Sequence, residues 1–578
     1  MDLFPDFEIA CEGLKVENDS PRYIELEHKE GGEKNTIIKL DKFVTHVETL
    51  KDRYKDLLVM AGYIFAADRK ASRGSIRTEE YTKWSREFTI HLKVRGLKFW
   101  DNETINKLLN DALCFMSGDH KYHFKFYQAE PDFPTSIFDN DEFQPRMPED
   151  CKIALFSGGL DSLAGVIDLL HNTKSEIWLA SHQSGSTKTK GVQRKLFAAL
   201  NERYPGRCQH YKYQCGLTIE QASDEPQRTR PFLYFSTAFV LAAEYKQKEI
   251  TVFEKGITSI NFPETEDLIN SRSSRTTHPK TIALLEKLFS AIIREPFKIQ
   301  HPYLLKTKTD IVEILKTYNR LDLLDSSVSC SGTRKNMSGF SHCGACNQCI
   351  DRIYATYAAE VEKYDDNGIY RFSFLKEDLE EPHLIKLLNE YIRLAHTFKC
   401  QDIESFYLGR EMEVLDAVEF MKGERDEDKI EAIFTMCRKH ADQIEKAGNR
   451  MRKQYDSIFI PNRPLSFFSL VLGKKEYQKE PEEISKEAMV RQEIPIRRLK
   501  AILIENLKEL IAAGRITEGM NETKREPVLS KIVTPYIERK YILTPSQKHT
   551  IQQYLLRGDI QLKKQKGGFT VVDGYIRR

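Results

Sequence analysis

Lys152–Ser162 reads KIALFSGGLDS, and the residues that follow it read LAGVIDLL. The segment before the glycines is apolar enough for a buried strand, and the segment after them has the apolar spacing of a helix. Gly158 and Gly159 permit a tight turn whose backbone N–H groups can approach a ligand closely. The partial positive charge of a helix N-terminus favours phosphate at such a turn. The alternative is a plain strand-to-helix turn capped by Ser157 or Asp161.

Outward from this turn, short apolar runs alternate with helix-length amphipathic segments as far as about residue 318. The apolar runs are Ile153–Phe156, Ile177–Ala180, Tyr211–Tyr213, Ile250–Phe253 and Phe297–Ile299. The helical candidates lie near Leu160–Leu170, Gly191–Tyr204, Pro231–Tyr245, Pro279–Ile293 and Lys308–Tyr318. This alternation predicts an α/β fold with a parallel sheet and right-handed crossovers. Ligands of such sheets bind at the carboxyl ends of the strands, which is where the glycine turn would lie.

A cluster of cysteines follows this region. Four of the eleven cysteines are Cys330, Cys343, Cys346 and Cys349, the last three within HCGACNQC. Two-residue spacers let one tight turn direct successive thiolates at a single ion, and Gly344 relieves the crowding. The spacing predicts a structural Cys₄ zinc site, with an iron–sulfur cluster as the alternative. His342 stands beside the cluster, but we do not expect it to be a ligand.

Length and composition exclude several classes of protein. A chain of 578 residues suggests about three or four domains, and 40% apolar residues exclude disorder throughout. The formal charge of +2 excludes nucleic-acid binding through overall charge, and the odd number of cysteines argues against a secreted disulfide framework. No apolar stretch reaches the length of about 18 residues that a membrane helix needs, and the start lacks a secretory signal. We therefore expect a soluble, cytoplasmic protein without a membrane partner.

The texture of the sequence predicts four regions. Residues 1–148 mix apparent strands and helices and predict an N-terminal α+β domain. Residues 149–362 hold the glycine turn and the cysteines, and residues 363–480 have the pattern of charged helices. Residues 481–578 carry 19 Lys and Arg against 12 Asp and Glu. They predict a basic helical module that closes on a hairpin at Gly558–Tyr575.

The sequence SGGLDS at 157–162 resembles the PP-loop of ATP pyrophosphatases, which cleave ATP to AMP and pyrophosphate and adenylate an acceptor oxygen. It matches neither the Walker nor the dinucleotide-binding glycine pattern. Together with the four cysteines and Arg352, the turn resembles the 7-cyano-7-deazaguanine synthase (QueC) family over residues 149–362. TKTDIV at Thr307–Val312 and RPFLYFS at Arg230–Ser236 are similar to two further stretches of that family. The resemblance implies an adenine nucleotide alpha hydrolase-like core.

The resemblance also implies a reaction: with ATP and Mg²⁺, and with Zn²⁺ in the cysteine site, the chain would adenylate the carboxylate of 7-carboxy-7-deazaguanine and form an amide. It implies catalytic roles for Ser157, Asp161 and Lys308. The ATP-binding residues that it implies are Ser157, Gly158, Gly159, Leu160, Asp161, Ser162, Ser181, His182 and Lys308. The candidates for the deazaguanine site are Arg230, Glu254, Asn261, Phe262, Glu264 and His278. Glu254 and the segment 261–264 depart from the residues that the family shows there, and His278 is a candidate acid or base.

Enlarged relatives of this family occur in bacterial antiphage systems of the type IV CBASS and Qat kinds. This implies that a partner protein, CD-NTase-like or another defence protein, supplies an N-terminal amine as the acceptor, and that the added regions hold that partner. One alternative is a synthase that uses ammonia and makes the nitrile. A second is a tRNA-modifying PP-loop enzyme whose basic C-terminal region binds nucleic acid. A third is a non-catalytic nucleotide sensor or scaffold.

Overall fold

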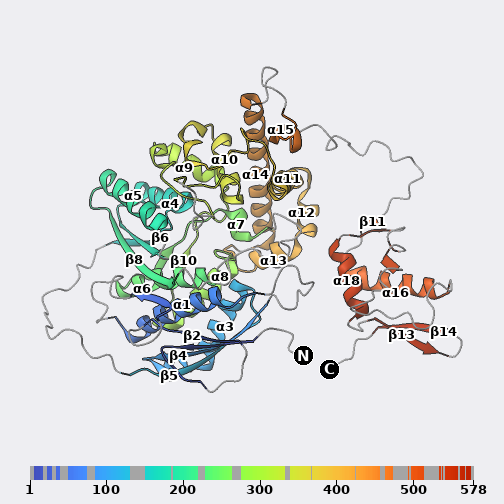
Figure 1. The fold of residues 1–578 in the computed structure, drawn as a ribbon, viewed down its shortest axis with the longest axis horizontal. Helices are drawn as coiled ribbons and strands as arrows, with labels where there is room; N and C mark the ends of the chain where they lie inside the picture. The colour runs from blue at the N-terminus through green and yellow to red at the C-terminus, as the bar shows by residue number, and fades with distance from the viewer. Residues whose placement is uncertain are drawn as a thin grey trace. The chain divides into compact units, whose positions relative to one another are not determined.

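The structure is a computed structural model, drawn in Figure 1. It describes residues 6–16, 22–28, 34–39, 50–73, 85–130, 150–183, 187–218, 228–262, 275–331, 339–365, 367–423, 425–455 and 463–472. Nearer the C-terminus it describes residues 492–493, 496–512, 533–534, 537, 541–543, 545–556, 560–565 and 568–573. The chain divides into two compact units, residues 1–473 and 474–578.

The larger unit is built on a six-stranded sheet with the strand order β10-β9-β6-β7-β8-β3. Its strands are β3 (Thr36–Lys39), β6 (Cys151–Leu155), β7 (Glu176–Gln183), β8 (Cys208–Leu217), β9 (Glu249–Thr251) and β10 (Lys298–Gln300). All neighbours are parallel except β3, which pairs antiparallel with β8. The predicted α/β class with a parallel sheet is therefore confirmed. The order reverses at β6, because β7 and β8 lie on one side of it and β9 and β10 on the other.

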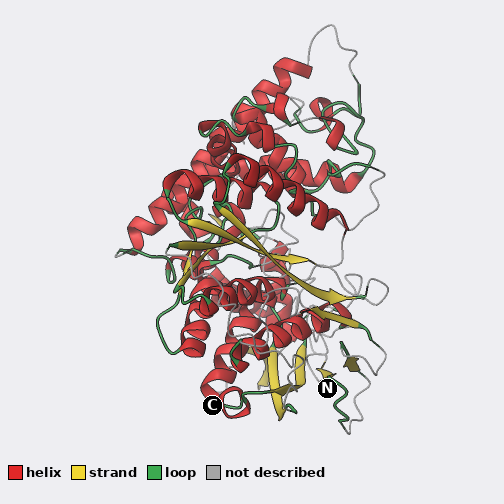
Figure 2. Ribbon diagram, turned by 90° about the vertical axis from the view of Figure 1, so that its left-hand side faces the viewer, coloured by secondary structure: helices red, strands yellow, loops and turns green. Residues whose placement is uncertain are grey.

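Helices cover both faces of this sheet (Figure 2). They are α4 (Leu160–Asn172), α5 (Thr187–Arg203), α6 (Arg230–Glu244), α8 (Pro279–Ile293) and α9 (Lys308–Thr317). The short helix α7 (Gly256–Ile260) follows β9 and packs in the core of the later helices. The apolar side chains of α4, α5 and α9 form one core cluster, and those of α6 and α8 belong to another. Helix α4 approaches the end of β9 so closely that a Cβ atom on Gly165 would lie 2.1 Å from Cγ of Phe253. Only glycine fits there, and this contact sets α4 against the sheet.

A second sheet, in the order β2-β1-β4-β5, lies in the N-terminal region. It consists of β1 (Asp6–Cys11), β2 (Tyr23–Leu26), β4 (Glu87–Val94) and β5 (Lys121–Gln128), and all three pairings are parallel. The prediction of an α+β arrangement is therefore wrong, and the region is α/β. Parallel pairing requires crossover connections, and α1 (Asp52–Lys70) lies between β2 and β4 in the chain, while α2 (Leu97–Trp100) and α3 (Glu103–Ser117) lie between β4 and β5.

Helix α1 connects the N-terminal region to the larger sheet. It buries 15 of its 19 residues, which include the apolar run Leu57–Ala61. It lies between the two sheets in Figure 1 and touches α6, β8, β2 and β3. A helix that is apolar nearly all round is typical of such a buried position. Because β3 also joins the edge of the larger sheet, residues before 149 complete the architecture that carries the glycine turn.

A buried charge network reinforces this connection. The side chain of Arg86 is fully buried and pairs with Asp68 on α1 and with Asp119. The other oxygen of Asp68 accepts hydrogen bonds from the backbone N–H and the hydroxyl of Thr229, at 2.9 and 3.0 Å, directly before α6. Burial by itself raises the pKa of Asp68, but Arg86 and Arg73 outweigh it and hold the pKa below its ordinary value. The carboxylate is therefore charged and tied to both layers.

The region after residue 346 is mainly helical. It contains α10 (Asn347–Ala358), α11 (Pro382–Cys400), α12 (Ile403–Gly409), α13 (Glu411–Val418), α14 (Asp426–Tyr455) and α15 (Phe467–Leu470), with short 3₁₀ turns at Glu362–Tyr364 and Asn367–Ile369. A further 3₁₀ turn, Leu321–Leu323, precedes this region. Helix α14 packs on both α10 and α11. Its apolar stripe and theirs share one core cluster with the cysteine segment.

The second unit has its own small core. It contains β11 (Gln492–Glu493), α16 (Ile496–Ala512), β12 (Tyr541–Ile542), α18 (Pro545–Leu556), β13 (Ile560–Gln565) and β14 (Gly568–Asp573). Leucines at the helical spacing 499, 503, 507 and 510 are buried along α16. Strands β13 and β14 pair antiparallel, so the predicted terminal hairpin is confirmed. Among the described parts of the chain, no helix combines the length and apolar character that crossing a bilayer requires.

We predict that Asp68→Ala lowers the free energy of unfolding by about 3 to 5 kcal/mol, because it leaves Arg86 buried with an incomplete set of partners. Urea unfolding followed by circular dichroism measures this change. Asp52→Ala, at the exposed start of the same helix, is the control and should cost less than about 1 kcal/mol. Equal midpoints for the two variants would show that the network does not hold the layers together.

Candidate active site and metal centre

The glycine turn lies at the carboxyl end of β6, directly before α4. Gly158 has a φ of 84°, a backbone conformation that glycine adopts without strain. The Oγ of Ser157 accepts the N–H of Gly159 at 3.2 Å, and the hydroxyl of Ser162 donates to the carbonyl of Gly159 at 3.0 Å. The hydroxyls of Ser157 and Ser162 also lie 3.2 Å apart. These contacts hold the turn in one conformation.

The turn leaves the first amides of α4 available. Gly159 is the N-cap residue and has no side chain to cap the helix. The N–H of Leu160 has only a long contact, 3.5 Å, with the hydroxyl of Ser329. Neither Ser157 nor Asp161 caps α4, so the alternative of a plain capped turn does not describe the structure. Uncapped amides at a helix N-terminus favour an anion.

Asp161, Glu254 and Lys308 meet beside the turn. The ammonium group of Lys308 pairs with Asp161, which also shares a hydrogen bond with the Glu254 carboxyl group. Burial alone raises the pKa of Asp161, but Lys308 outweighs it and keeps that pKa below its ordinary value. Burial, and then the charge of Asp161, raise the pKa of Glu254 to about 8. At neutral pH Glu254 therefore carries a proton and Asp161 a negative charge.

The backbone explains why these three side chains converge. Asp161 opens α4 after β6, and Glu254 follows β9, the strand next to β6 at the reversal of the sheet order. Ligands of open parallel sheets bind in the crevice at such a reversal. Lys308 is the first residue of α9, whose N-cap Thr307 forms a capping box with Asp310. The capping box fixes the first turn of α9 and with it the base of the Lys308 side chain.

A second buried ion pair adjoins this cluster. Lys255, the neighbour of Glu254, pairs with Asp351 on α10. The hydroxyl of Tyr391 on α11 donates to the other oxygen of Asp351 at 2.7 Å, and His440 on α14 lies near enough to interact electrostatically with this pair. Burial lowers the pKa of His440 to about 4, so the ring is neutral at pH 7. The positive charge of Lys255 also helps to stabilise the Asp161 carboxylate.

Sequence reasoning missed this second pair. Lys255 and Asp351 had local signals, since Lys255 follows the end of a predicted strand and Asp351 stands between Cys349 and Arg352. Tyr391 and His440 had no such local signal, because they belong to helices that are remote in the sequence. Only the packing of α11 and α14 on α10 brings them to Asp351.

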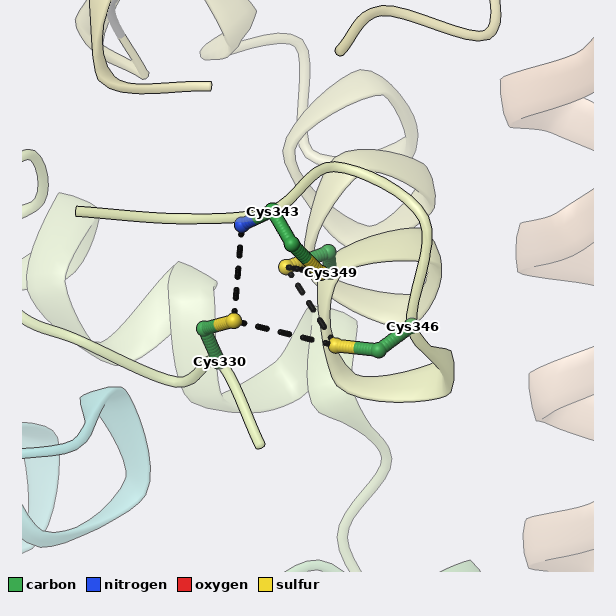
Figure 3. Close-up of side chains that lie close together, drawn as sticks. All are labelled: Cys330, Cys343, Cys346 and Cys349. Atoms are coloured by element: carbon green, nitrogen blue, oxygen red, sulfur yellow. Dashed lines mark hydrogen bonds between the residues drawn. The ribbon is translucent and has the colours of Figure 1, made fainter. Parts of the chain in front are cut away.

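The four cysteines converge on one point (Figure 3). Their sulfur atoms all lie within 4.8 Å of one another, and the Sγ atoms of Cys346 and Cys349 are 3.5 Å apart. The pairs Cys343 with Cys349 and Cys346 with Cys330 are 3.9 and 4.0 Å apart. A tetrahedral zinc ion with Zn–S bonds of about 2.3 Å places sulfurs about 3.8 Å apart, so the set fits. The cysteines can hold a metal ion such as zinc.

Both ring nitrogens of His342 bond elsewhere. Nε2 accepts the N–H of Ser329 at 3.3 Å, and Nδ1 lies 2.8 Å from the hydroxyl of Ser341. His342 therefore braces the cysteine module and is not positioned as a further ligand. Gly344 has a φ of 78°, and a Cβ atom there would lie 1.8 Å from the carbonyl oxygen of Phe372. This explains the need for glycine within the module.

The cysteine module also contacts the glycine turn. The N–H of Val328 donates to the carbonyl of Gly158 at 3.0 Å, two residues before Cys330. Arg352 is fully buried on α10 and donates to the carbonyls of Leu324 and Ser327 and to Asp365. The strap of residues 324–330 is thus held against the turn from the metal side, and an ion in the module would secure its far end.

The remaining predicted nucleotide residues are engaged inside the sheet. The hydroxyl of Ser181 donates to the carbonyl of Phe156 at 2.6 Å and lies 2.9 Å from Nε2 of His210. Nε2 of His182 lies 2.7 Å from the carbonyl oxygen of Cys215. These contacts account for the burial of both side chains without a ligand.

The predicted deazaguanine residues other than Glu254 are dispersed. Arg230 is exposed at the start of α6, over the ring of Tyr234, and Asn261 ends α7 in the left-handed conformation. Phe262 is buried in the core and its ring contacts those of Phe398 and Phe406. His278 caps α8 by accepting the N–H of Lys280 at 3.2 Å, and burial, with Arg275 nearby, lowers its pKa to about 3. Glu264 lies outside the described residues.

No protein-family model matches the chain, and no curated protein matches it. The candidate site combines uncapped helix amides, a lysine and two adjacent carboxyl groups at the reversal of a parallel sheet. Such a set suits an anion accompanied by a divalent cation.

We predict that Cys346→Ser lowers both the bound metal and the thermal stability, by about 5 °C or more, because a structural ion contributes to folding. Elemental analysis and differential scanning calorimetry measure the two effects. Cys400→Ser is the control, since Cys400 is exposed on α11 and outside the cluster. Full stability without metal in Cys346→Ser would contradict a structural role.

Proposed function

We propose that the chain cleaves ATP to AMP and pyrophosphate in order to adenylate the carboxylate of 7-carboxy-7-deazaguanine, and then forms an amide. The observation that carries the proposal is the meeting of Asp161, Glu254 and Lys308 beside the glycine turn. This arrangement of side chains supports the same function as the resemblance of the sequence to the PP-loop and to the QueC family. A carboxylate is a poor electrophile, and an adenylate gives it a good leaving group.

The residues of the site suit the proposed first step. The amides of the glycine turn would bind the phosphates, and Lys308 would stabilise the negative charge that develops on the departing pyrophosphate. Asp161 and Glu254 offer carboxylate oxygens, which are the ligands that Mg²⁺ prefers, so these residues would hold that ion. When bound, Mg²⁺ would neutralise phosphate charge. To hold the ion, Glu254 would give up its proton and Asp161 would separate from Lys308, and that lysine would then be able to bind the phosphates.

The acceptor in this proposal is the N-terminal amine of a partner protein in a bacterial defence system. Such an amine attacks the adenylate as ammonia would, and the product stays an amide. The regions outside residues 149–362 give the chain surfaces that a small-molecule synthase would not need. The alternative of a tRNA-modifying enzyme draws support from one observation, the excess of Lys and Arg in residues 481–578. Salt-sensitive tRNA binding would favour that alternative.

We predict that the purified chain with Mg²⁺, ATP and 7-carboxy-7-deazaguanine forms AMP and pyrophosphate, and that Asp161→Ala abolishes this activity while the fold is kept. Chromatography of the nucleotides and a pyrophosphate assay measure both products. Asp168→Asn, on the same helix but bonded to Tyr303 and Tyr318, is the matched control and should stay active. Undiminished turnover by Asp161→Ala would remove the loop from the mechanism.

We predict that the Mg²⁺ affinity of the site rises with pH. Below a pKa of about 8 Glu254 is protonated, and a metal ion must displace that proton. The affinity should therefore increase about tenfold per pH unit between pH 6.5 and 8 and level off above pH 8. Titration of AMP formation against Mg²⁺ at each pH measures it, with Glu254→Gln expected to be weak and independent of pH. A flat profile for the unmodified chain would refute the assignment of Glu254.

A further inference from the structure

Helix α14 reaches the start of α9 through two side chains on one face. The ammonium group of Lys439 lies 2.9 Å from Oδ1 of Asp310, and Nε2 of Gln443 donates to the same oxygen at 3.0 Å. Residues four apart lie above one another on a helix, so a single surface of α14 makes both contacts. Asp310 is nearly buried, which makes each contact more valuable than it would be in water.

The two carboxylate oxygens of Asp310 bind different parts of the structure. Oδ2 accepts the N–H of Thr307 at 3.1 Å and so closes the capping box at the start of α9. Oδ1 is the oxygen that α14 holds. Burial would raise the pKa of Asp310, but Lys439, the Thr307 amide and Gln443 together lower it. The carboxylate is thus charged, and it joins α14 to the turn that carries Lys308.

The position of Lys308 depends on this junction. Lys308 stands between Thr307 and Asp310, and its side chain crosses to Asp161 on α4. A displacement of about 1 Å at a reacting group can reduce a rate by about a hundredfold. The side chains of Lys439 and Gln443 therefore act on Lys308 through Asp310, which lies in the same helical turn. They do not themselves contact the glycine turn.

The same helical region holds the other side of the carboxylate cluster. Tyr391 from α11 and His440 from α14 surround Asp351, the partner of Lys255, and Lys255 follows Glu254 directly. His440 follows Lys439 in the sequence, so one turn of α14 interacts both with Asp310 and with Asp351. Each of the two lysines beside the carboxyl groups is held in place through residues of α11 or α14.

We propose that α11 and α14 form a clamp that positions the two lysines of the ATP site, with Lys439 and Gln443 as positioning residues for Lys308. The proposal rests on the proposed ATP cleavage and assigns a role in it to the helices that follow the cysteine module. Residues 149–362 alone would have the ligands of the site and the capping box, but not the contacts that α11 and α14 make with Asp351 and Asp310.

The test compares Lys439→Ala/Gln443→Ala with Lys446→Ala. Lys446 is a matched control because it lies on α14, pairs with Glu360 at 2.9 Å and has a 54% exposed side chain, against 55% for Lys439. We expect the double variant to lose about tenfold in kcat, with a much smaller change in the KM for ATP, because Lys308 acts on charge that develops during the reaction. Lys439→Arg alone should keep nearly full activity, and Lys446→Ala should match the unmodified chain.

Amide hydrogen exchange of residues 308–312 gives a second readout that needs no catalysis. We expect faster exchange there in the double variant and none of this change in Lys446→Ala. If the unmodified chain makes no AMP, the proposed function fails, and the exchange result alone decides whether the clamp exists. Unchanged exchange, or a kcat equal to that of Lys446→Ala in an active enzyme, would overturn the clamp.

Discussion

Two carboxyl groups, those of the buried Asp161 and the half-buried Glu254, lie side by side, and removing both from water is costly unless a proton or cations compensate them. Much of the surrounding structure supplies that compensation. Lys308 pairs with Asp161 from a helix 147 residues away, and Lys255 adds charge from the adjacent position. The remaining imbalance is met by the proton on Glu254. A site of this kind is poised to exchange its proton and its lysine contact for a divalent cation and phosphates.

The rest of the fold fixes the positions of the two carboxyl groups and the two lysines relative to one another. Strands β6 and β9 place Asp161 and Glu254 at the reversal of the sheet, and the glycine contact at Gly165 sets the depth of α4. The strap before Cys330 bonds to the glycine turn, so the cysteine module acts on the site through the backbone. The N-terminal layer supports the opposite face through α1 and the Asp68 network. The helical region completes the set by holding Asp310 and Asp351.

The local pattern of the sequence was sufficient for the five parallel strands of the central sheet, the cysteine cluster and the terminal hairpin, because each has a short-range signal. The antiparallel strand β3 at the edge of that sheet was not predicted. The resemblance implied that Asp161 and Lys308 belong to one site, but their ion pair was not predicted. The parallel topology of the N-terminal sheet was missed, since strand patterns do not encode the direction of the partner strand. The burial of Phe262 against Phe398 and Phe406, and the approach of Tyr391 to Asp351, depend on packing between remote helices. Such contacts between remote helices cannot be predicted from the spacing of residues along the chain.

One measurement tests the central claim most directly: tracing oxygen from the acceptor carboxylate. The chain is incubated with Mg²⁺, ATP, an amine and 7-carboxy-7-deazaguanine whose carboxylate carries ¹⁸O, and the nucleotide product is analysed by mass spectrometry. If the carboxylate attacks the α-phosphorus and AMP then departs from the acyl carbon, one ¹⁸O atom appears in AMP. Unlabelled AMP, or label in inorganic phosphate together with ADP, would contradict the account.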